Sequence, residues 1–129
     1  MNTPEQLVNK AKISTITDFV SEQSDTDNSR YVFAYTITIE NVSEEPFQLI
    51  SRHWIIQDAN RKVEEVYGDG VVGQQPLIRP GESYTYSSGA VLETEIGTME
   101  GRYFMLSNST DEFEVQIPKF VLSVPRTLH

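Results

Sequence analysis

A Gly-x-Gly-x-x-Gly stretch occupies residues 68–73, and the sequence after it does not predict a helix. In a dinucleotide-binding unit this spacing closes a strand-to-helix turn, and the amides and positive end of that helix hold a pyrophosphate. Here Pro76 follows shortly afterwards, and Pro80-Gly81 predicts a turn. The glycine spacing alone therefore does not predict a cofactor enzyme. It predicts a bend in a chain whose remaining sequence predicts β-strands.

The size and composition of the chain are those of one folded domain covering residues 1–129. A domain of 129 residues buries about two-thirds of its unfolded surface, which is enough for a core of its own. Hydrophobic residues make up 38% of the chain, and the aromatic residues are spread along it, which argues against general disorder.

The charge balance and the absence of cysteine exclude several classes of function. Nineteen acidic and ten basic residues give a formal charge of −9, so we expect neither a nucleic acid nor a membrane surface as a partner. Without cysteine there can be no disulfide, thiolate metal site or cysteine nucleophile. No apolar signal segment or long apolar run is present, which predicts a cytoplasmic location.

Alternation of apolar and polar residues predicts strands along most of the chain. The strongest signal is at 31–40, where one face carries Tyr31, Phe33, Tyr35, Ile37 and Ile39. Pro118 favours an edge strand or a bulge in the last predicted strand. The other strands are expected at 13–20, 47–57, 62–67, 82–88, 102–106 and 113–124. Seven or eight short strands with almost no helical periodicity predict an all-β antiparallel sandwich of two sheets.

The segment 47–57 has the composition of a central strand, because bulky side chains fall on both of its faces. Strict alternation places Leu49 and Ile55 on one face. It places Ile50, Trp54 and Ile56 on the other.

Five motifs follow one another in the middle of the chain: Arg52-His53-Trp54, Gly68-x-Gly70-Val71-Val72-Gly73-x-x-Pro76, Pro80-Gly81, Tyr86-x-Ser88-Gly89 and Gly97-x-Met99-x-Gly101-x-Tyr103. This order resembles the ApaG (CorD) family. Two flanking motifs extend the resemblance over about residues 31–122: Tyr35-x-Ile37-x-Ile39-x-Asn41 and Ile117-Pro118-x-Phe120-x-Leu122. Residues 1–12 and the tail 125–129 lie outside it. Within the first of these, Thr3-Pro4-Glu5-Gln6 fits the start of a short helix.

The resemblance implies a fibronectin type III-like, immunoglobulin-like sandwich and does not imply a reaction. Bacterial members of the family are linked with cobalt resistance and magnesium efflux, and often neighbour a diadenosine tetraphosphate hydrolase. Eukaryotic relatives carry the same domain in F-box and DNA-polymerase-interacting proteins. That eukaryotic usage implies a protein-binding module.

The residues alone leave three uses open for the loop 68–73. It can be a β-bulge or tight connection that needs a positive φ at one or more glycines. It can hold a phosphate in a nest of amides, although the carboxylates of Glu64, Glu65 and Asp69 would oppose a polyphosphate. It can contact a protein through Val71 and Val72, if these side chains lie outside the core.

Arg52 and His53 are neighbours on a predicted strand, so His53 points away from both Arg52 and Trp54. Two interpretations remain. The two residues are partly buried and satisfied by carbonyls or carboxylates, or one of them lines a recognition groove beside the glycine loop.

Metal binding and catalysis have little support in the sequence. The only histidines are His53 and His129, so no metal site and no cofactor are predicted. Scattered carboxylates could attract a hard cation weakly but are typical of a solvated surface: Glu64, Glu65, Asp69, Glu93 and Glu95. There is no Gly-x-Ser-x-Gly motif and a single internal histidine, which argues against an enzyme.

The sequence therefore predicts a non-enzymatic module that binds an unidentified protein partner. The candidate binding residues are Arg52, His53, Gly68, Asp69, Gly70, Val71, Val72 and Gly73. The alternative is a small-molecule binder that recognises a nucleotide pyrophosphate, or its magnesium complex, through the same loop. The sequence does not specify an oligomeric state.

Overall fold

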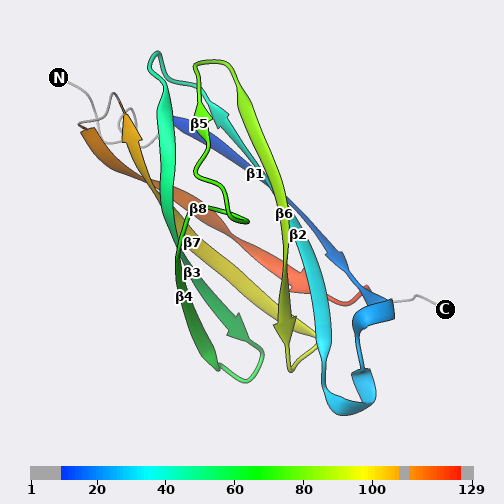
Figure 1. Cartoon of the computed structure of the whole chain (residues 1–129). Coiled ribbons are helices and arrows are strands. Elements are labelled where there is room, and N and C mark those ends of the chain that lie inside the picture. Colours follow the sequence, from blue (N-terminus) through cyan, green and yellow to red (C-terminus); the bar gives the residue numbers. More distant parts are fainter. Residues whose placement is uncertain (1–9, 108–110, 126–129) are drawn as a thin grey trace.

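The computed structural model describes residues 10–107 and 111–125, which form two antiparallel β-sheets (Figure 1). Within these residues the chain has eight strands and two single-turn 3-10 helices: β1 (Ala11–Phe19), η1 (Ser21–Gln23), η2 (Thr26–Asn28), β2 (Tyr31–Asn41), β3 (Phe47–Asp58), β4 (Val63–Asp69), β5 (Leu77–Ile78), β6 (Ser83–Leu92), β7 (Ile96–Ser107) and β8 (Asp111–Ser123). In the same ranges, no helix has the length and apolar character needed to cross a membrane. The helix expected at Thr3–Gln6 lies outside the described residues.

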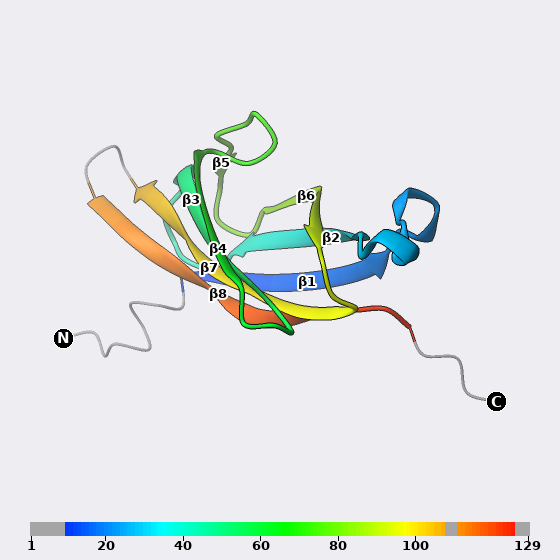
Figure 2. The same ribbon diagram turned by 90° about the horizontal axis from the view of Figure 1, so that it is seen from below.

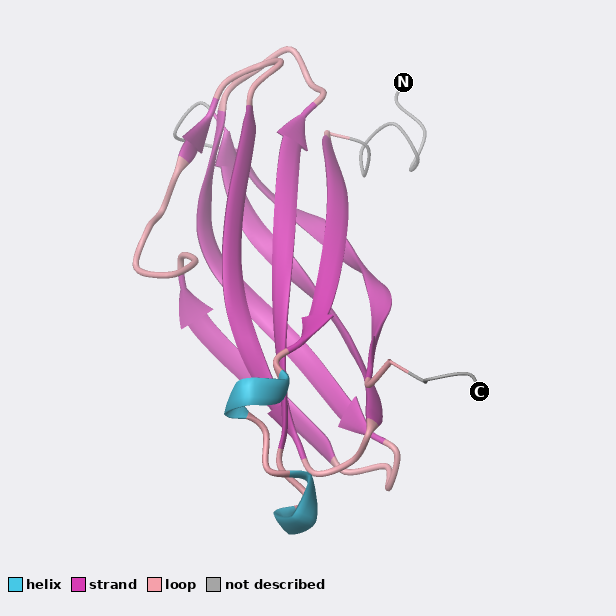
Figure 3. Ribbon diagram, turned by 90° about the vertical axis from the view of Figure 1, so that its right-hand side faces the viewer, coloured by secondary structure: helices cyan, strands magenta, loops and turns pink. Residues whose placement is uncertain are grey.

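The two sheets confirm the predicted sandwich. One has the strand order β1-β2-β6, and the other has the order β4-β3-β7-β8. The short β5 pairs with the start of β3, at Phe47 and Gln48, and so continues the edge that β4 forms further along. Figure 2 shows the two layers from below, and Figure 3 shows that strands make up nearly all of the regular structure.

The core lies between the sheets and is built from alternate residues of the long strands. On β2 the predicted inward face is confirmed, because Phe33, Tyr35, Ile37 and Ile39 are all buried. Facing them from the larger sheet, Trp54 makes edge contacts with the rings of Tyr35 and Phe120, at centroid distances of 5.5 and 5.9 Å. Burying each of these large side chains contributes about 1.5–3 kcal/mol, so the core dominates the stability of the fold.

The strand β3 departs from the predicted alternation at Ile50. Leu49 pairs with Met105 but Ser51 pairs with Phe104, so Ile50 is an extra residue in a β-bulge. One extra residue moves every later side chain to the opposite face. Leu49 and Trp54 are therefore both buried in the core. The prediction that Leu49 shares a face with Ile55 is wrong for this reason.

Pro118 and the Pro80-Gly81 pair lie where the sequence predicts an irregular strand and a turn. Pro118 lies on β8, an edge strand, opposite a register shift between Met99 and Gly101. At the predicted Pro80-Gly81 turn, Gly81 has a φ of +81°. These two local predictions are confirmed.

A hydrogen bond between two tyrosines joins the sheets inside the core. The hydroxyl of Tyr86, on β6, is hydrogen-bonded to that of Tyr103, on β7. Tyr103 is fully buried and Tyr86 nearly so, and this burial raises the pKa of both hydroxyls well above the usual value. Both groups therefore stay protonated and act as each other's partner.

Replacing one of these tyrosines should cost more stability than replacing both. Tyr86→Phe leaves the buried Tyr103 hydroxyl without its partner, and we expect the free energy of unfolding to fall by about 1–3 kcal/mol. The double variant Tyr86→Phe/Tyr103→Phe removes both hydroxyls and should recover part of that loss. Urea denaturation of the two variants measures this. A double variant less stable than Tyr86→Phe would contradict the explanation.

Candidate functional site

The glycine loop is an excursion from the edge of the larger sheet. After β4 the Gly70 amide donates to the carbonyl of Ile50 at 2.8 Å. After the excursion the Leu49 amide donates to the carbonyl of Pro76 at 3.0 Å. Residues 71–75 thus leave and rejoin the sheet beside the bulge in β3, between β4 and β5 (Figure 1). No helix follows the glycines in this part of the structure, which continues into β5.

The tip of the excursion is a two-residue turn. Val71 and Gln74 bond to each other through both backbone groups, at 2.8 and 2.9 Å. Val72 and Gly73 between them have positive φ angles of 47° and 76°, as in a type I′ turn. The turn directs Val71 into the core, where its side chain is fully buried, and leaves Val72 61% exposed. The expectation that Val71 offers apolar surface is therefore wrong, and of the two valines only Val72 can touch a partner.

Each glycine of the motif has its own steric reason. A Cβ on Gly68 would lie 2.6–2.8 Å from the guanidinium atoms of Arg52. A Cβ on Gly70 would overlap the backbone oxygen of Gln74, and Gly70 also has a φ of +62°. Gly73 has open space around it and is needed only for its left-handed conformation. The spacing is thus explained by a tight connection, one of the three uses that the sequence left open.

The side chain of Arg52, on β3, holds this loop in place through hydrogen bonds. Its side chain passes over Gly68, its partner in the ladder, and its Nη1 donates to the carbonyls of Asp69 at 3.1 Å and Gly70 at 2.8 Å. No carboxylate of residues 10–107 or 111–125 forms a salt bridge with it. Nη1 of the guanidinium therefore bonds to backbone carbonyls, in line with the first of the two interpretations.

His53 lies on the opposite, outer face of the sheet, as alternation predicts. Its ring is buried beneath that of Tyr67, with the centroids 4.0 Å apart and the planes nearly parallel. Nε of Arg102 lies 3.4 Å from Nδ1, and because a guanidinium can only donate, Nδ1 accepts. Nε2 then carries the proton and donates to Glu65 Oε1 at 3.1 Å. Arg52 and His53 do not form one cluster.

The other acidic residues considered as cation ligands are dispersed. Glu65 pairs with His53, and Glu93 pairs with Lys62 at 3.2 Å. Across the described ranges, no three or more His, Cys, Asp or Glu side chains come together in a way that could hold a metal ion.

Exposed apolar side chains lie along the sheet edge before, within and after the loop. Nine large hydrophobic side chains are exposed in the part of the chain that the structure describes, and four of them lie on β4, the excursion and β5. We call these four, Val63, Tyr67, Val72 and Leu77, the β4–β5 edge. The sequence did not single out Tyr67 or Leu77, because alternation alone does not reveal which strand ends a sheet.

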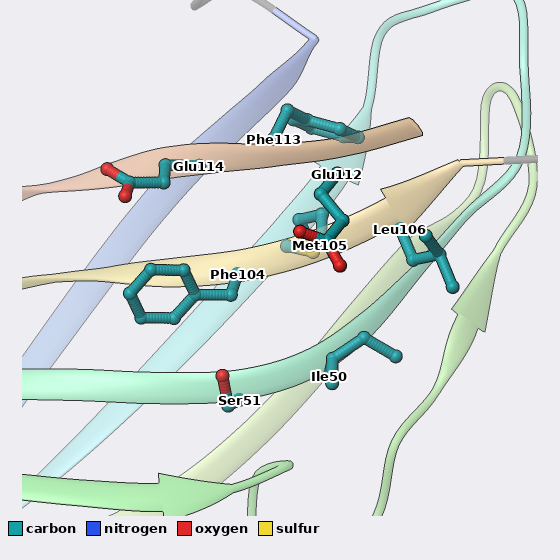
Figure 4. A pocket seen from close by; sticks show the side chains of 8 residues that line it. All are labelled: Ile50, Ser51, Phe104, Met105, Leu106, Glu112, Phe113 and Glu114. Carbon is teal, nitrogen blue, oxygen red and sulfur yellow. The ribbon is translucent and has the colours of Figure 1, made fainter. Parts of the chain in front are cut away.

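An apolar groove of about 570 Å³ lies on the outer face of the larger sheet, over β3, β7 and β8. Figure 4 shows Ile50 of β3 and Phe104 and Leu106 of β7 along it, with the carboxylates of Glu112 and Glu114 on β8 at one side. The bulge makes Ile50 available here. Because that bulge is not visible in the sequence, neither is the groove.

Comparison with known proteins identifies the family. Residues 21–107 match the family model of the ApaG domain. The chain belongs to the ApaG family. The protein ApaG of Dechloromonas aromatica is 55% identical over 120 residues, which cover 93% of this chain and 94% of that relative. The protein ApaG of Thiobacillus denitrificans is 57% identical over 117 residues, covering 91% and 92% of the two chains.

Solved structures agree with the family assignment. The ApaA protein from Bordetella pertussis has 50% sequence identity and a TM-score of 0.87, over 91% of this chain and 95% of that chain. The C-terminal domain of Wzt has a TM-score of 0.55 at 10% identity, covering 92% of this chain and 75% of its own. That second likeness concerns the fold alone. The sandwich seen here is thus the ApaG fold.

Alanine substitutions should rank the three glycines by their steric roles. Gly70→Ala should be the most damaging, because its Cβ meets backbone and its φ is positive. Gly73→Ala should cost about 1–2 kcal/mol from its left-handed conformation alone. In Gly68→Ala the clash is with a side chain, so adding Arg52→Ala should relieve it. Urea unfolding of the variants measures the order, and a Gly73→Ala loss larger than that of Gly70→Ala would refute it.

Val72 is a β-branched residue in a left-handed conformation, which is unfavourable. Val72→Asn creates Asn-Gly, the pair that a type I′ turn prefers. We expect the free energy of unfolding to rise by about 1 kcal/mol. Thermal unfolding beside Val42→Asn, which changes an exposed valine without a positive φ, tests this. Equal effects at the two positions would show that Val72 is not strained.

Proposed function

We propose that this member of the ApaG family is a non-catalytic module of the cytoplasm that binds a protein partner along the β4–β5 edge. The observation that carries the proposal is that Val63, Tyr67, Val72 and Leu77 are exposed along one edge of an otherwise acidic domain. Four of the nine exposed large hydrophobic residues of the described chain thus lie along this one edge, where a partner that runs along it could cover them.

Tyr67 is suited to anchor such a contact. One face of its ring is held against His53, whereas the residue as a whole remains 67% exposed. A ring fixed in this way loses little conformational entropy when a partner covers it. Tyrosine is also enriched at interfaces and among the residues that contribute most to binding.

The strained turn supports the same surface. Val72 lies at the tip of the excursion, exposed, in a conformation that costs a β-branched residue free energy. Arg52 and the buried Val71 fix the base of the turn, so the Val72 side chain is presented at a defined place. Of the binding residues predicted from the sequence, Arg52 and the glycines therefore hold the turn in place, and Val72 is part of the proposed binding surface.

The alternative function, recognition of a nucleotide pyrophosphate or its magnesium complex, has less support. The three glycines each have a structural reason, and the Arg52 Nη1 group is engaged by two carbonyls. The link to cobalt and magnesium homeostasis that the family resemblance implies would, in our proposal, act through the protein partner.

Removing apolar side chains from the β4–β5 edge should abolish partner binding without unfolding the domain. We expect Tyr67→Ser and Leu77→Ser each to reduce the recovery of partners in a pull-down by about tenfold, the loss of one anchoring contact of about 1.4 kcal/mol. Ile16→Ser is the matched control, because Ile16 is 70% exposed on β1 of the other sheet. Thermal unfolding would verify the fold of each variant.

Equal recovery with Tyr67→Ser, Leu77→Ser and wild type would contradict this surface. Equal loss with Ile16→Ser would show that the binding is non-specific.

A further inference from the structure

We infer that the partner binds as an additional β-strand on β4, and that this strand carries a basic residue flanked by apolar ones. The inference rests on the proposed function and specifies the chemistry of the partner. It follows from the backbone of β4, from the absence of protection along that strand, and from its charge.

The hydrogen bonds at both ends of the β3–β4 ladder show which backbone groups of β4 are unused. At one end the Gly70 amide donates to Ile50, and at the other the Asp58 amide donates to Lys62. The register between these two bonds is unbroken. Directly bonded pairs alternate with unbonded pairs in an antiparallel ladder. The residues of β4 that bond to β3 are therefore Glu64, Val66 and Gly68.

The intervening residues Val63, Glu65 and Tyr67 direct their amides and carbonyls away from β3. Because β4 ends the sheet, no strand of residues 10–107 or 111–125 pairs with these groups. The side chains of the same three residues lie on the outer face, opposite Gln57, Ile55 and His53. A strand added here would gain backbone hydrogen bonds and side-chain contacts from the same three positions.

The β4 strand lacks three of the features that usually prevent edge pairing: proline, lysine and a bulge. The edge strand β8 differs on each point, because it contains Pro118 and Lys119 and a register shift. At the remaining edges, β1 carries Lys12 and contacts β8, whereas β6 has no charged residue.

The negative charge of β4 indicates which kind of strand can pair with its free edge. Its seven residues include Glu64, Glu65 and Asp69 and no basic residue. A second copy pairing antiparallel about Glu65 would set two Glu65 carboxylates opposite each other, and pairing about Tyr67 would set Glu65 opposite Asp69. Like charges directly opposite are destabilising. Pairing about Val66 avoids such opposite pairs but still brings three carboxylates from each strand together with no basic residue between them. A basic residue facing Glu65 is favourable, with apolar residues two positions away on each side facing Val63 and Tyr67.

The probe is the capped peptide Thr-Val-Thr-Lys-Thr-Val-Thr, compared with the same peptide carrying Glu for Lys. In amide spectra of the labelled full chain, the lysine peptide should cause saturable shifts at Glu65 and Tyr67 that exceed those at Glu64 and Val66. Added salt should weaken binding. The glutamate peptide should bind severalfold more weakly.

Two variants of Glu65 isolate the backbone contribution. Glu65→Pro removes an amide that faces away from β3 and is tolerated at an edge, whereas Glu65→Thr keeps that amide and removes the same carboxylate. We expect binding of the lysine peptide to be about tenfold weaker in Glu65→Pro than in Glu65→Thr. If Glu65→Pro does not fold, the wild-type amide shifts still test strand addition, because they should be larger at Glu65 and Tyr67 than at Glu64 and Val66.

The inference is overturned by absent shifts, by shifts confined to β6, or by equal binding of the two peptides. It is also overturned if sedimentation shows a dimer that Glu65→Pro abolishes, since the occupant would then be a second copy. If the pull-down depends on Tyr67 but the peptide does not bind, the module proposal stands and strand addition fails. If neither binds, the proposed function itself fails.

Discussion

The single extra residue at Ile50 determines how the candidate site is built. It reverses the faces of β3, so that Arg52 and Trp54 point inward and His53 points outward. The Ile50 carbonyl also accepts the amide of Gly70 and the side-chain amide of Gln75, which fixes both ends of the excursion. The apolar groove lies against the same residue. One irregularity in a central strand thus fixes where the loop, the groove and the exposed edge lie relative to one another.

The glycine motif shows how one spacing can arise from unrelated physical causes. In a dinucleotide-binding fold the glycines admit a pyrophosphate and a helix. In this chain they admit the Arg52 side chain, a backbone approach to Gln74 and a left-handed turn residue. The same two-residue turn places Val71 in the core and leaves Val72 exposed. The loop is therefore part of the packing of the sandwich as well as part of its surface.

The β4–β5 edge combines properties that a purely structural edge would not need. Its apolar side chains are exposed, and alternate backbone groups of β4 have no partner strand among residues 10–107 and 111–125. The charged residues of β4 are all acidic. His53 supports the exposed Tyr67 from beneath, and Glu65 and Arg102 hold His53 in place. These features are the basis on which we propose a surface for an extended partner that carries a basic residue.

The sequence by itself determined most of the strands, the two-layered sandwich, the turn at Pro80-Gly81 and the opposite directions of Arg52 and His53. These follow from local rules, because alternation and turn preferences depend only on neighbouring residues. The sequence did not predict β5 or the first half of β7. The tertiary structure alone decided that β3 bulges at Ile50, that Val71 is buried, and that β4 ends a sheet beside Leu77. A bulge exists only relative to a partner strand, and burial and edges depend on strand order, so no local pattern encodes them.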